Sequence, residues 1–236
     1  MLHHIKVNLA GLNIDIEYKD EKIAKLCRDY VAEFSEPDIK VLYSEEGCAT
    51  EKGKGNHGDL AAEFANIYRQ IAEALPRFSR AVAHGAAITY KGNAYLFIAK
   101  SGTGKTTHIK LWREHFDGIG IINGDKPILK VDKENVIAYG TPWAGKEMFQ
   151  KNTSAPIKGI CVIRRASKNS IRRLKTDEAI NAIIKQIYLS QNGEILGLTM
   201  RLINDIIGLV PFYELSCDIS REAAVCSFTA MTGEKI

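Results

Sequence analysis

The stretch YLFIAKSGTGKTTHIKLW, residues 95–112, decides the fold of this chain. Its first four residues, Tyr95–Ile98, are apolar and predict a buried strand, whereas the residues from Thr106 onward predict a helix. The connection Ser101–Lys105 contains two glycines. A glycine-rich turn between a strand and a helix points successive backbone N–H groups inward, where they cradle phosphate. The stretch therefore predicts a phosphate-binding loop at the start of a helix.

Individual positions of this loop fit the pattern G-x-x-x-x-G-K-[ST], in which the lysine reaches the β- and γ-phosphates and the hydroxyl ligates Mg²⁺. Lys105 and Thr106 take these two roles, and Ala99 stands where the first glycine belongs. A chance glycine turn with a solvated lysine is the alternative. The residues expected to bind the nucleotide are Ser101, Gly102, Thr103, Gly104, Lys105, Thr106 and Thr107.

A carboxylate follows the next predicted strand. The apolar run Gly118–Ile122 leads into Asn123-Gly124-Asp125. Asp125 can hold Mg²⁺ or accept a proton from an attacking hydroxyl. The alternative is a turn aspartate, because Asn, Gly and Asp are common in turns.

The remainder of residues 81–236 alternates short apolar runs with helical patterns. Strand pairs are expected at Ala83–Tyr90 with Ala94–Ala99, Ile128–Val131 with Val136–Tyr139, and Lys158–Arg164 with Ser170–Leu174, together with a last strand at Pro211–Cys217. Helices are expected at Thr176–Ser190, Glu194–Leu209 and Ser220–Thr232, the last with Ser220 as N-cap. His108 and Trp112, four residues apart, share one helix face and are expected to pack on the sheet. We therefore expect an α/β fold with a mixed, largely antiparallel sheet around the glycine-loop helix.

Residues 1–80 are predicted to form a smaller α/β region that binds the substrate or a partner. Within His4–Tyr18 two strands flank Ala10-Gly11, and a short strand covers Ile39–Tyr43. Helices are expected over Asp20–Phe34 and Leu60–Leu75, the second stopped by Pro76. The segment Glu45–Asp59 is rich in Gly, Lys and Glu and predicts a loop.

The bulk composition narrows the class of protein. The net charge is +4 over 236 residues, which is too mild to indicate a nucleic-acid partner. Five cysteines without a CxxC pair indicate free thiols in a reducing compartment. We expect a cytoplasmic protein, because no apolar run is typical of a signal peptide or of a membrane span.

With these features in place, the chain resembles a known family. Ala83-His84-Gly85-Ala86-Ala87, the Lys91-Gly92 turn, the loop Ser101–Thr107 and Asn123-Gly124-Asp125 are similar to the catalytic domain of HPr kinase/phosphorylase. The loop is also similar to that of ATP-dependent phosphoenolpyruvate carboxykinase. The resemblance implies that His84 lies near the transferred phosphate, that Lys105 and Thr106 hold phosphate and metal, and that Asp125 is the base.

The chain also departs from that family. HPr kinases carry two adjacent aspartates where this chain has Gly124-Asp125, and their glycine-arginine signature is missing. Instead Tyr139–Gly145, YGTPWAG, is similar to a segment of HPr-kinase-related proteins with other or unknown substrates. Of Arg164 and Arg165, one is expected to face the site because strand side chains alternate, and Arg164 is chosen as the nucleotide clamp. Glu147 is a further candidate for the metal.

The expected function is a Mg-ATP-dependent kinase that phosphorylates a hydroxyl of a protein serine or of a small metabolite. The resemblance to a hexameric family implies self-association. The alternative is a nucleotide-binding accessory module of a peptide-modification system that catalyses nothing.

Overall fold

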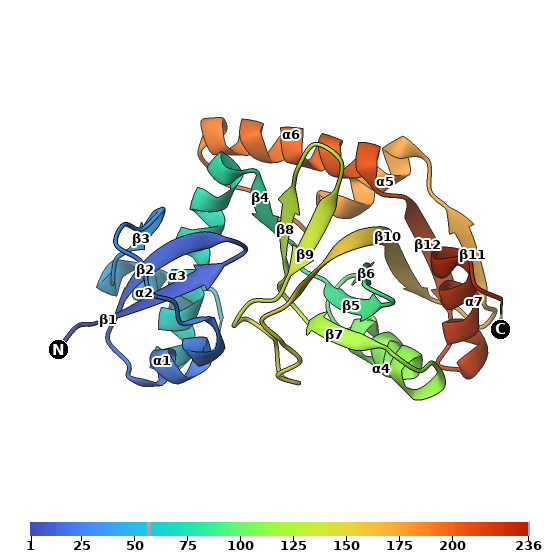
Figure 1. Ribbon diagram of the computed structural model, residues 1–236, viewed down its shortest axis with the longest axis horizontal. Coiled ribbons are helices and arrows are strands. Elements are labelled where there is room, and N and C mark those ends of the chain that lie inside the picture. The colour runs from blue at the N-terminus through green and yellow to red at the C-terminus, as the bar shows by residue number, and fades with distance from the viewer. Residues whose placement is uncertain (56–57, 236) are drawn as a thin grey trace. The chain divides into compact units, whose positions relative to one another are not determined.

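The computed structural model describes residues 1–55 and 58–235, and it divides the chain into two compact units, Met1–Phe78 and Ser79–Ile236 (Figure 1). Each unit has its own sheet, and the candidate site lies wholly in the second.

The first unit contains a sheet with the order β1-β2-β3. Its strands are β1 (His3–Leu9), β2 (Leu12–Tyr18) and β3 (Ile39–Val41), and its helices are α1 (Lys22–Cys27), η1 (Arg28–Tyr30), α2 (Glu45–Gly53), α3 (Asp59–Ala74) and η2 (Leu75–Phe78). The predicted hairpin is confirmed: β1 pairs antiparallel with β2, and Ala10 and Gly11 turn with φ values of 53° and 77°. β3 pairs parallel with β2.

Two predictions for the first unit are wrong. The helix expected over Asp20–Phe34 ends far earlier, because Val31 forms a bridge with Val7 and Ala32 N–H donates to the Lys6 carbonyl. The expected loop Glu45–Asp59 contains helix α2, apart from residues 56–57, which lie outside the described residues.

Helix α2 begins at a cap and is fixed by an ion pair. The Ser44 hydroxyl accepts a hydrogen bond from Gly47 N–H at 2.9 Å, which satisfies one of the free donors of the first turn. Glu51 is buried and accepts from the guanidinium of Arg69 on α3. Long-range pairing thus stabilises a segment whose composition suggested a loop.

Among the described residues, the second unit forms a nine-stranded sheet whose main path is β4-β8-β9-β10-β6-β5-β7, with β12 beside β10 and β11 beside β12. The strands are β4 (Arg80–Val82), β5 (Ala86–Tyr90), β6 (Asn93–Ile98), β7 (Gly120–Asn123), β8 (Ile128–Val131), β9 (Val136–Tyr139), β10 (Ser154–Arg165), β11 (Ser170–Arg173) and β12 (Phe212–Cys217). Among the described strands of this unit, only the pairs β10–β6 and β10–β12 are parallel. The expected mixed, largely antiparallel sheet is confirmed.

One predicted pairing in this sheet is wrong. We expected the strands around Lys158–Arg164 and Ser170–Leu174 to form a hairpin, but β12 lies between them. β12 pairs parallel with β10 and antiparallel with β11. β12 takes the inner place, with Phe212, Leu215 and Cys217 buried, and the more exposed β11 stays at the edge.

Helices cover both faces of this sheet, α5 (Thr176–Ile183) and α6 (Gly193–Leu209) on one face and α4 (Lys105–His115) and α7 (Arg221–Thr232) on the other (Figure 1). Strand β6 contributes to both cores, since Leu96 and Ile98 pack on the α5/α6 side and Tyr95 and Phe97 on the α4/α7 side. His108 packs against Phe97 as expected, and its ring nitrogen contacts the Ser227 hydroxyl at 2.8 Å.

The helix expected over Thr176–Ser190 also ends early, at Ile183. The following residues turn back to the sheet: Ile187 forms a bridge with Ala83, and Tyr188 N–H donates to the Val82 carbonyl. This return brings Gln186 beside His84, where His84 N–H donates to the Gln186 carbonyl at 2.6 Å.

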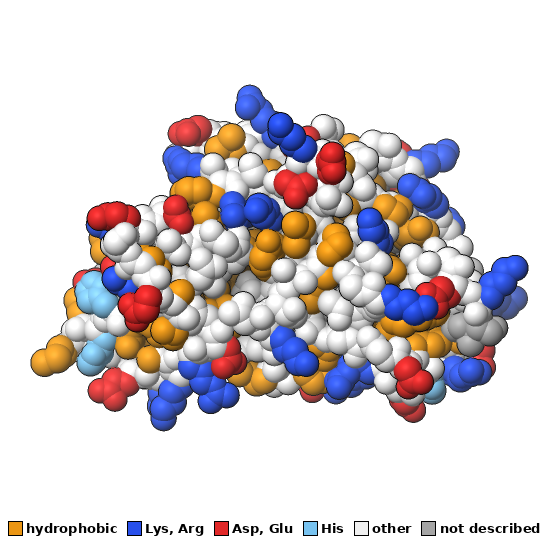
Figure 2. All heavy atoms as spheres, viewed as in Figure 1, with side chains coloured by type: hydrophobic (Ala, Val, Ile, Leu, Met, Phe, Trp, Pro, Cys, Tyr) orange, Lys and Arg blue, Asp and Glu red, His pale blue; other side chains and the backbone are white. Residues whose placement is uncertain are grey.

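On the face of the molecule shown in Figure 2, Lys and Arg side chains are interspersed with Asp and Glu. This intermixing agrees with the mild net charge of +4. Within residues 1–55 and 58–235, no helix combines the length and apolar character needed to cross a membrane.

Candidate phosphate-binding site

The glycine loop connects β6 to α4 and has the backbone that its sequence requires. Gly102 and Gly104 have φ values of 76° and 123°, in the region that favours glycine. Thr103 N–H donates to the Lys100 carbonyl at 3.1 Å, which closes the turn. Ala99 is absent from the described residues with positive φ, so alanine fits where the motif usually has glycine.

Sheet register brings three distant segments to the mouth of this loop. β5 lies between β6 and β7 and runs antiparallel to both, with Ala86 opposite Phe97 and Ala87 opposite Asn123. The beginning of β5 therefore lies beside the ends of β6 and β7. His84 lies just before β5, the glycine loop follows β6 and Asp125 follows β7, so all three come to this edge of the sheet.

Lys105 places a buried amine at this point. The residue is 8% exposed, and Nζ donates to the Ala99 carbonyl at 3.0 Å and lies 3.2 Å from Nε2 of His84. Burial lowers the pKa of Lys105, opposed by the negative charge of Asp125. No carboxylate among the described residues forms an ion pair with this amine. A buried cation at a helix N-terminus favours an anionic ligand.

Asp125 faces the imidazole of His84. Its Oδ1 lies 3.4 Å from His84 Nε2, and its Oδ2 lies 3.7 Å from Nζ of Lys126. Burial alone would raise the pKa of Asp125, but the His84 hydrogen bond and the charges of Lys126 and Lys105 outweigh it and lower the pKa. The carboxylate is therefore ionised at neutral pH and can accept a proton or bind a cation.

Asn123 fixes the turn that carries Asp125. Its side chain is fully buried, and Oδ1 accepts from the N–H groups of Asp125 and Lys126 at 2.8 and 2.7 Å. Nδ2 donates to the Thr141 carbonyl at 3.0 Å. The carbonyl of Asp125 accepts from Gly85 N–H at 2.9 Å, which ties the turn to the residue after His84.

The segment Tyr139–Gly145 supports the same turn. The Thr141 hydroxyl donates to the Lys126 carbonyl at 2.8 Å. A Cβ at Gly140 would lie 1.8 Å from the Lys151 carbonyl oxygen, and one at Gly145 would lie 3.2 Å from Cβ of Asp125. Both glycines therefore permit close backbone contact. Trp143 in the same segment is buried.

Gln186 is a site residue that the sequence did not indicate. Its terminal nitrogen, assigned from its surroundings, donates to His84 Nδ1 at 3.3 Å, to the His84 carbonyl at 3.2 Å and to the Ala99 carbonyl at 3.3 Å. Both carbonyls are acceptors only, which requires the nitrogen on that side. No local pattern could reveal this contact, because it depends on the chain returning to Ala83 after α5.

The two arginines at the end of β10 point to different partners. Arg165 donates from Nε to the Thr103 carbonyl at 3.0 Å and from Nη2 to the Gly102 carbonyl. Arg164 instead pairs with Glu214 on β12. The expected alternation holds, and Arg165 is the one that contacts the loop. The nucleotide contact predicted for Arg164 stays a prediction.

Two cavities border the glycine loop. The first, which we call the α5-side cavity, has a volume of about 1150 Å³ and is lined by His84, Lys100–Thr103 (Ser101 included), Leu174, Asn181 and Gln186, among others. The second, the α4-side cavity, has a volume of about 390 Å³ and is lined by Thr103, Gly104, Thr107, Leu111, Ile163, Arg165, Ala166, Asp218 and Ile219, among others. Thr103 borders both cavities, whereas Gly102 borders the first and Gly104 borders the second.

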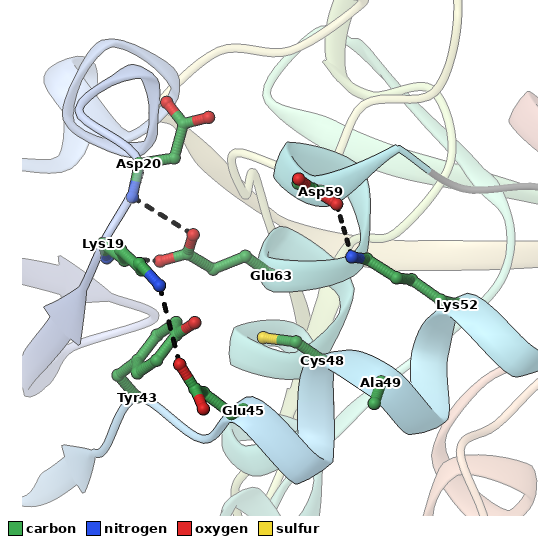
Figure 3. A pocket seen from close by; sticks show the side chains of 9 residues that line it. All are labelled: Lys19, Asp20, Tyr43, Glu45, Cys48, Ala49, Lys52, Asp59 and Glu63. Carbon is green, nitrogen blue, oxygen red and sulfur yellow. Dashed lines mark hydrogen bonds and ion pairs between the residues drawn. The ribbon is translucent and has the colours of Figure 1, made fainter.

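The first unit has a cavity of its own, of about 450 Å³ (Figure 3). Its two lysines are engaged: Lys19 pairs with Glu45 at 3.6 Å, and Lys52 pairs with Asp59. Glu63 accepts from the backbone N–H groups of Lys19 and Asp20. Lys19 and Lys52 thus differ from Lys105, whose buried amine has no carboxylate partner among the described residues.

Metal ligands at the glycine loop are few. Within the described part of the chain, no group of three or more His, Cys, Asp and Glu residues is arranged to hold a metal ion. Mg²⁺ needs no such group, because it keeps several waters and binds through one or two carboxylates and the substrate phosphates. The hydroxyl of Thr106, in the first turn of α4, and the carboxylate of Asp125 fit this requirement. Glu147, the other candidate, pairs with Lys110 at 3.1 Å.

Comparisons with known proteins give little beyond this geometry. No family model matches the chain, and no curated protein matches it. Among solved structures, the chain is similar to the Hpr(Ser) kinase/phosphatase from Coxiella burnetii, with 11% sequence identity and a TM-score of 0.39. The match covers 64% of this chain and 88% of that one. The two proteins share a distant structural likeness, which carries no argument about what this chain binds or does.

Proposed function

We propose that the second unit binds Mg-ATP at the glycine loop and transfers its γ-phosphoryl group to an acceptor hydroxyl. The observation that carries this proposal is the meeting of three groups at the loop. The amine of Lys105 lies 3.2 Å from His84 Nε2, which in turn lies 3.4 Å from the carboxylate of Asp125. A buried cation and an ionised carboxylate are groups that phosphoryl-transfer sites use, and an imidazole beside them can position the carboxylate or donate to a phosphate oxygen.

The glycine loop supplies the affinity for phosphate. The N-terminus of the 11-residue helix α4 carries unpaired N–H groups and the positive end of its dipole. Lys105 adds a full positive charge that is partly desolvated, so its attraction for an anion is stronger than that of a surface lysine. Arg165 holds the carbonyls of Gly102 and Thr103, which keeps the loop in shape before the ligand binds.

Thr106 and Asp125 are the residues that would hold Mg²⁺. When bound, the ion would neutralise charge on the β- and γ-phosphates. Asp125 accepts the proton of the acceptor hydroxyl, the hydroxyl oxygen forms a bond to the γ-phosphorus, and the bond from that phosphorus to the β,γ-bridging oxygen breaks. ADP and the phosphorylated acceptor are then the products, and Lys105 stabilises the negative charge of the transferring group.

The acceptor is a hydroxyl of a protein serine or of a small metabolite, and residues 1–80 are proposed to recognise it or a partner. The five free cysteines, four of them buried, support a reducing, cytoplasmic compartment.

A second candidate is a nucleotide-binding module that catalyses nothing. It is favoured by the single aspartate at the turn, where the resembling kinases have two. It is opposed by the contact between Asp125 and His84, because binding alone does not require a base beside an imidazole.

The test is transfer of label from γ-labelled ATP with Mg²⁺ to fractionated proteins and metabolites of the host, with the Lys105→Ala variant as control. Label that depends on Lys105 and appears in one fraction supports the kinase and identifies the class of acceptor. ATP binding without transfer to any fraction supports the binding module. If the Lys105→Ala variant transfers as much label as the unaltered protein, both candidate functions are contradicted.

A further inference from the structure

The carboxyl ends of three parallel strands meet beside the glycine loop. β6 and β12 both run parallel to β10, with Ile98 opposite Val162 and Cys217 opposite Arg165. In α/β sheets, ligands bind in crevices outside such strand ends. The α4-side cavity lies at this edge, since its lining includes the last residue of β10, Arg165, and residues 217–219 at the end of β12.

The two cavities share Thr103 and Arg165 but extend along different parts of the phosphate-binding loop. The α5-side cavity also borders His84 and Lys100–Gly102, whereas the α4-side cavity also borders Gly104 and Thr107. A nucleotide has a reacting end and a nucleoside end. If the γ-phosphate lies at Lys105, His84 and Asp125, the backbone N–H groups of the loop would bind the other phosphates toward the first turn of α4. The nucleoside would then lie on the side of Thr107.

We propose that the α4-side cavity binds the nucleoside of the bound nucleotide, an inference that rests on the proposed function. Its volume of about 390 Å³ is in the range of small-ligand pockets, about 300–1,000 Å³. The side chains of Leu111, Ala166 and Ile219 offer apolar surface to a purine or pyrimidine face.

Two charged residues, Arg165 and Asp218, also line the cavity. The guanidinium of Arg165, held by the loop carbonyls, can stack on the base. Asp218 uses Oδ1 to accept from Asn169 and Ser220, while Oδ2 makes no such bond within the described part of the chain. Oδ2 can therefore accept from a ribose hydroxyl or from an exocyclic amine of the base. Ile219 is 77% exposed, so its apolar side chain is accessible to a ligand.

The experiment compares the affinity of ATP with that of inorganic triphosphate, both with Mg²⁺, by titration calorimetry. The test variant is Ile219→Asn, which removes apolar surface without adding charge and, being exposed, leaves folding intact. The matched control is Leu42→Asn, another exposed hydrophobic residue at 61%, in the first unit. A third variant, Leu174→Asn, alters the α5-side cavity.

We expect Ile219→Asn to weaken ATP binding about fivefold through the loss of apolar contact and to leave triphosphate binding within twofold. Leu42→Asn should change neither. Selective loss of ATP affinity in Leu174→Asn but not in Ile219→Asn would place the nucleoside on the other side and overturn the inference. Equal affinities of ATP and triphosphate for the unaltered protein would also overturn the inference.

The results that would disprove the proposed function differ from those that would disprove the nucleoside assignment. If the unaltered protein binds neither ATP nor triphosphate, the phosphate site itself is disproved. If triphosphate binds and Ile219→Asn weakens both ligands equally, the phosphate site stands and the nucleoside assignment falls.

Discussion

Nε2 of His84 contacts both the amine of Lys105, at 3.2 Å, and the carboxylate of Asp125, at 3.4 Å. A neutral imidazole nitrogen either donates or accepts, so it cannot satisfy both neighbours. Gln186 resolves the choice, because its amide nitrogen faces Nδ1 at 3.3 Å and requires Nδ1 to accept. The proton then resides on Nε2 and points to Asp125, while a phosphate oxygen is a better acceptor for Lys105.

The tautomer of His84 is therefore expected to depend on Gln186. In the unaltered protein, long-range ¹H–¹⁵N spectra should show neutral His84 protonated on Nε2. Gln186→Glu replaces the donor with an acceptor and should move the proton to Nδ1, whereas Gln186→Leu should give a mixture of tautomers. The His84→Gln variant assigns the signals. Protonation on Nδ1 in the unaltered protein would contradict the role of Gln186.

Replacing the buried amine of Lys105 should weaken ATP binding without lowering the stability of the fold. Lys105→Met keeps the length of the side chain and removes the charge, so ATP affinity should fall at least about tenfold. The melting temperature should stay the same or rise, because the protein no longer desolvates a cation. Calorimetric titration and thermal unfolding measure the two effects. Lys133→Met, at an exposed lysine away from the loop, is the control. A large drop in melting temperature would show that Lys105 is a structural residue.

Removing the proposed base, Asp125, should slow phosphoryl transfer and leave ATP binding largely intact. Asp125→Asn is expected to reduce phosphoryl transfer about 10²–10⁴-fold and to change ATP affinity by less than tenfold. Stopped-assay rates and equilibrium titration measure these quantities. Rates within a factor of two of the unaltered protein would exclude Asp125 as the base.

The pH dependence follows from the pKa of the same carboxyl. His84, Lys126 and Lys105 hold the pKa of Asp125 below its ordinary value of 3.8, despite burial. The base is therefore ionised at every pH above that value, and no loss of activity between about pH 5 and 8 should arise from Asp125. A pH–rate profile whose acidic limb near neutrality disappears in Asp125→Glu would contradict this assignment.

Acid should destabilise the first unit through Glu51. Hydrogen bonds from Arg69, opposed by burial and assisted by Lys54, lower the pKa of Glu51 from 4.5 to about 2. Because the folded pKa is depressed, this stabilisation is complete above about pH 4.5 and is lost as the pH falls toward 2.

A substitution tests that linkage. Glu51→Gln should lower the free energy of unfolding by about 1–3 kcal/mol at neutral pH and have a smaller effect near pH 2. Denaturant unfolding at both pH values measures it. Glu46→Gln, at an exposed carboxylate of the same helix, is the control. An equal effect of Glu51→Gln at both pH values would show that the ion pair with Arg69 does not stabilise α2.

Prediction from the sequence succeeded where neighbouring residues decide the structure. The hairpins at Ala10-Gly11 and Lys91-Gly92 and the cap at Ser220 form as expected, because turn geometry and capping are local. It failed at α2, which has few apolar residues and depends on Glu51 reaching Arg69, and at β11, whose partner residues lie 40 to 46 positions further along the chain.

The sequence by itself determined the glycine loop, since Gly102, Gly104 and Lys105 stand between an apolar strand and a helix and impose their own backbone. It also indicated His84 and Asp125 one at a time. Only the tertiary structure brought them together, because β5 runs between β6 and β7 and aligns three strand ends at one edge. The buried state of the Lys105 amine and the contact from Gln186 likewise arise from packing, which no pattern of neighbouring residues encodes.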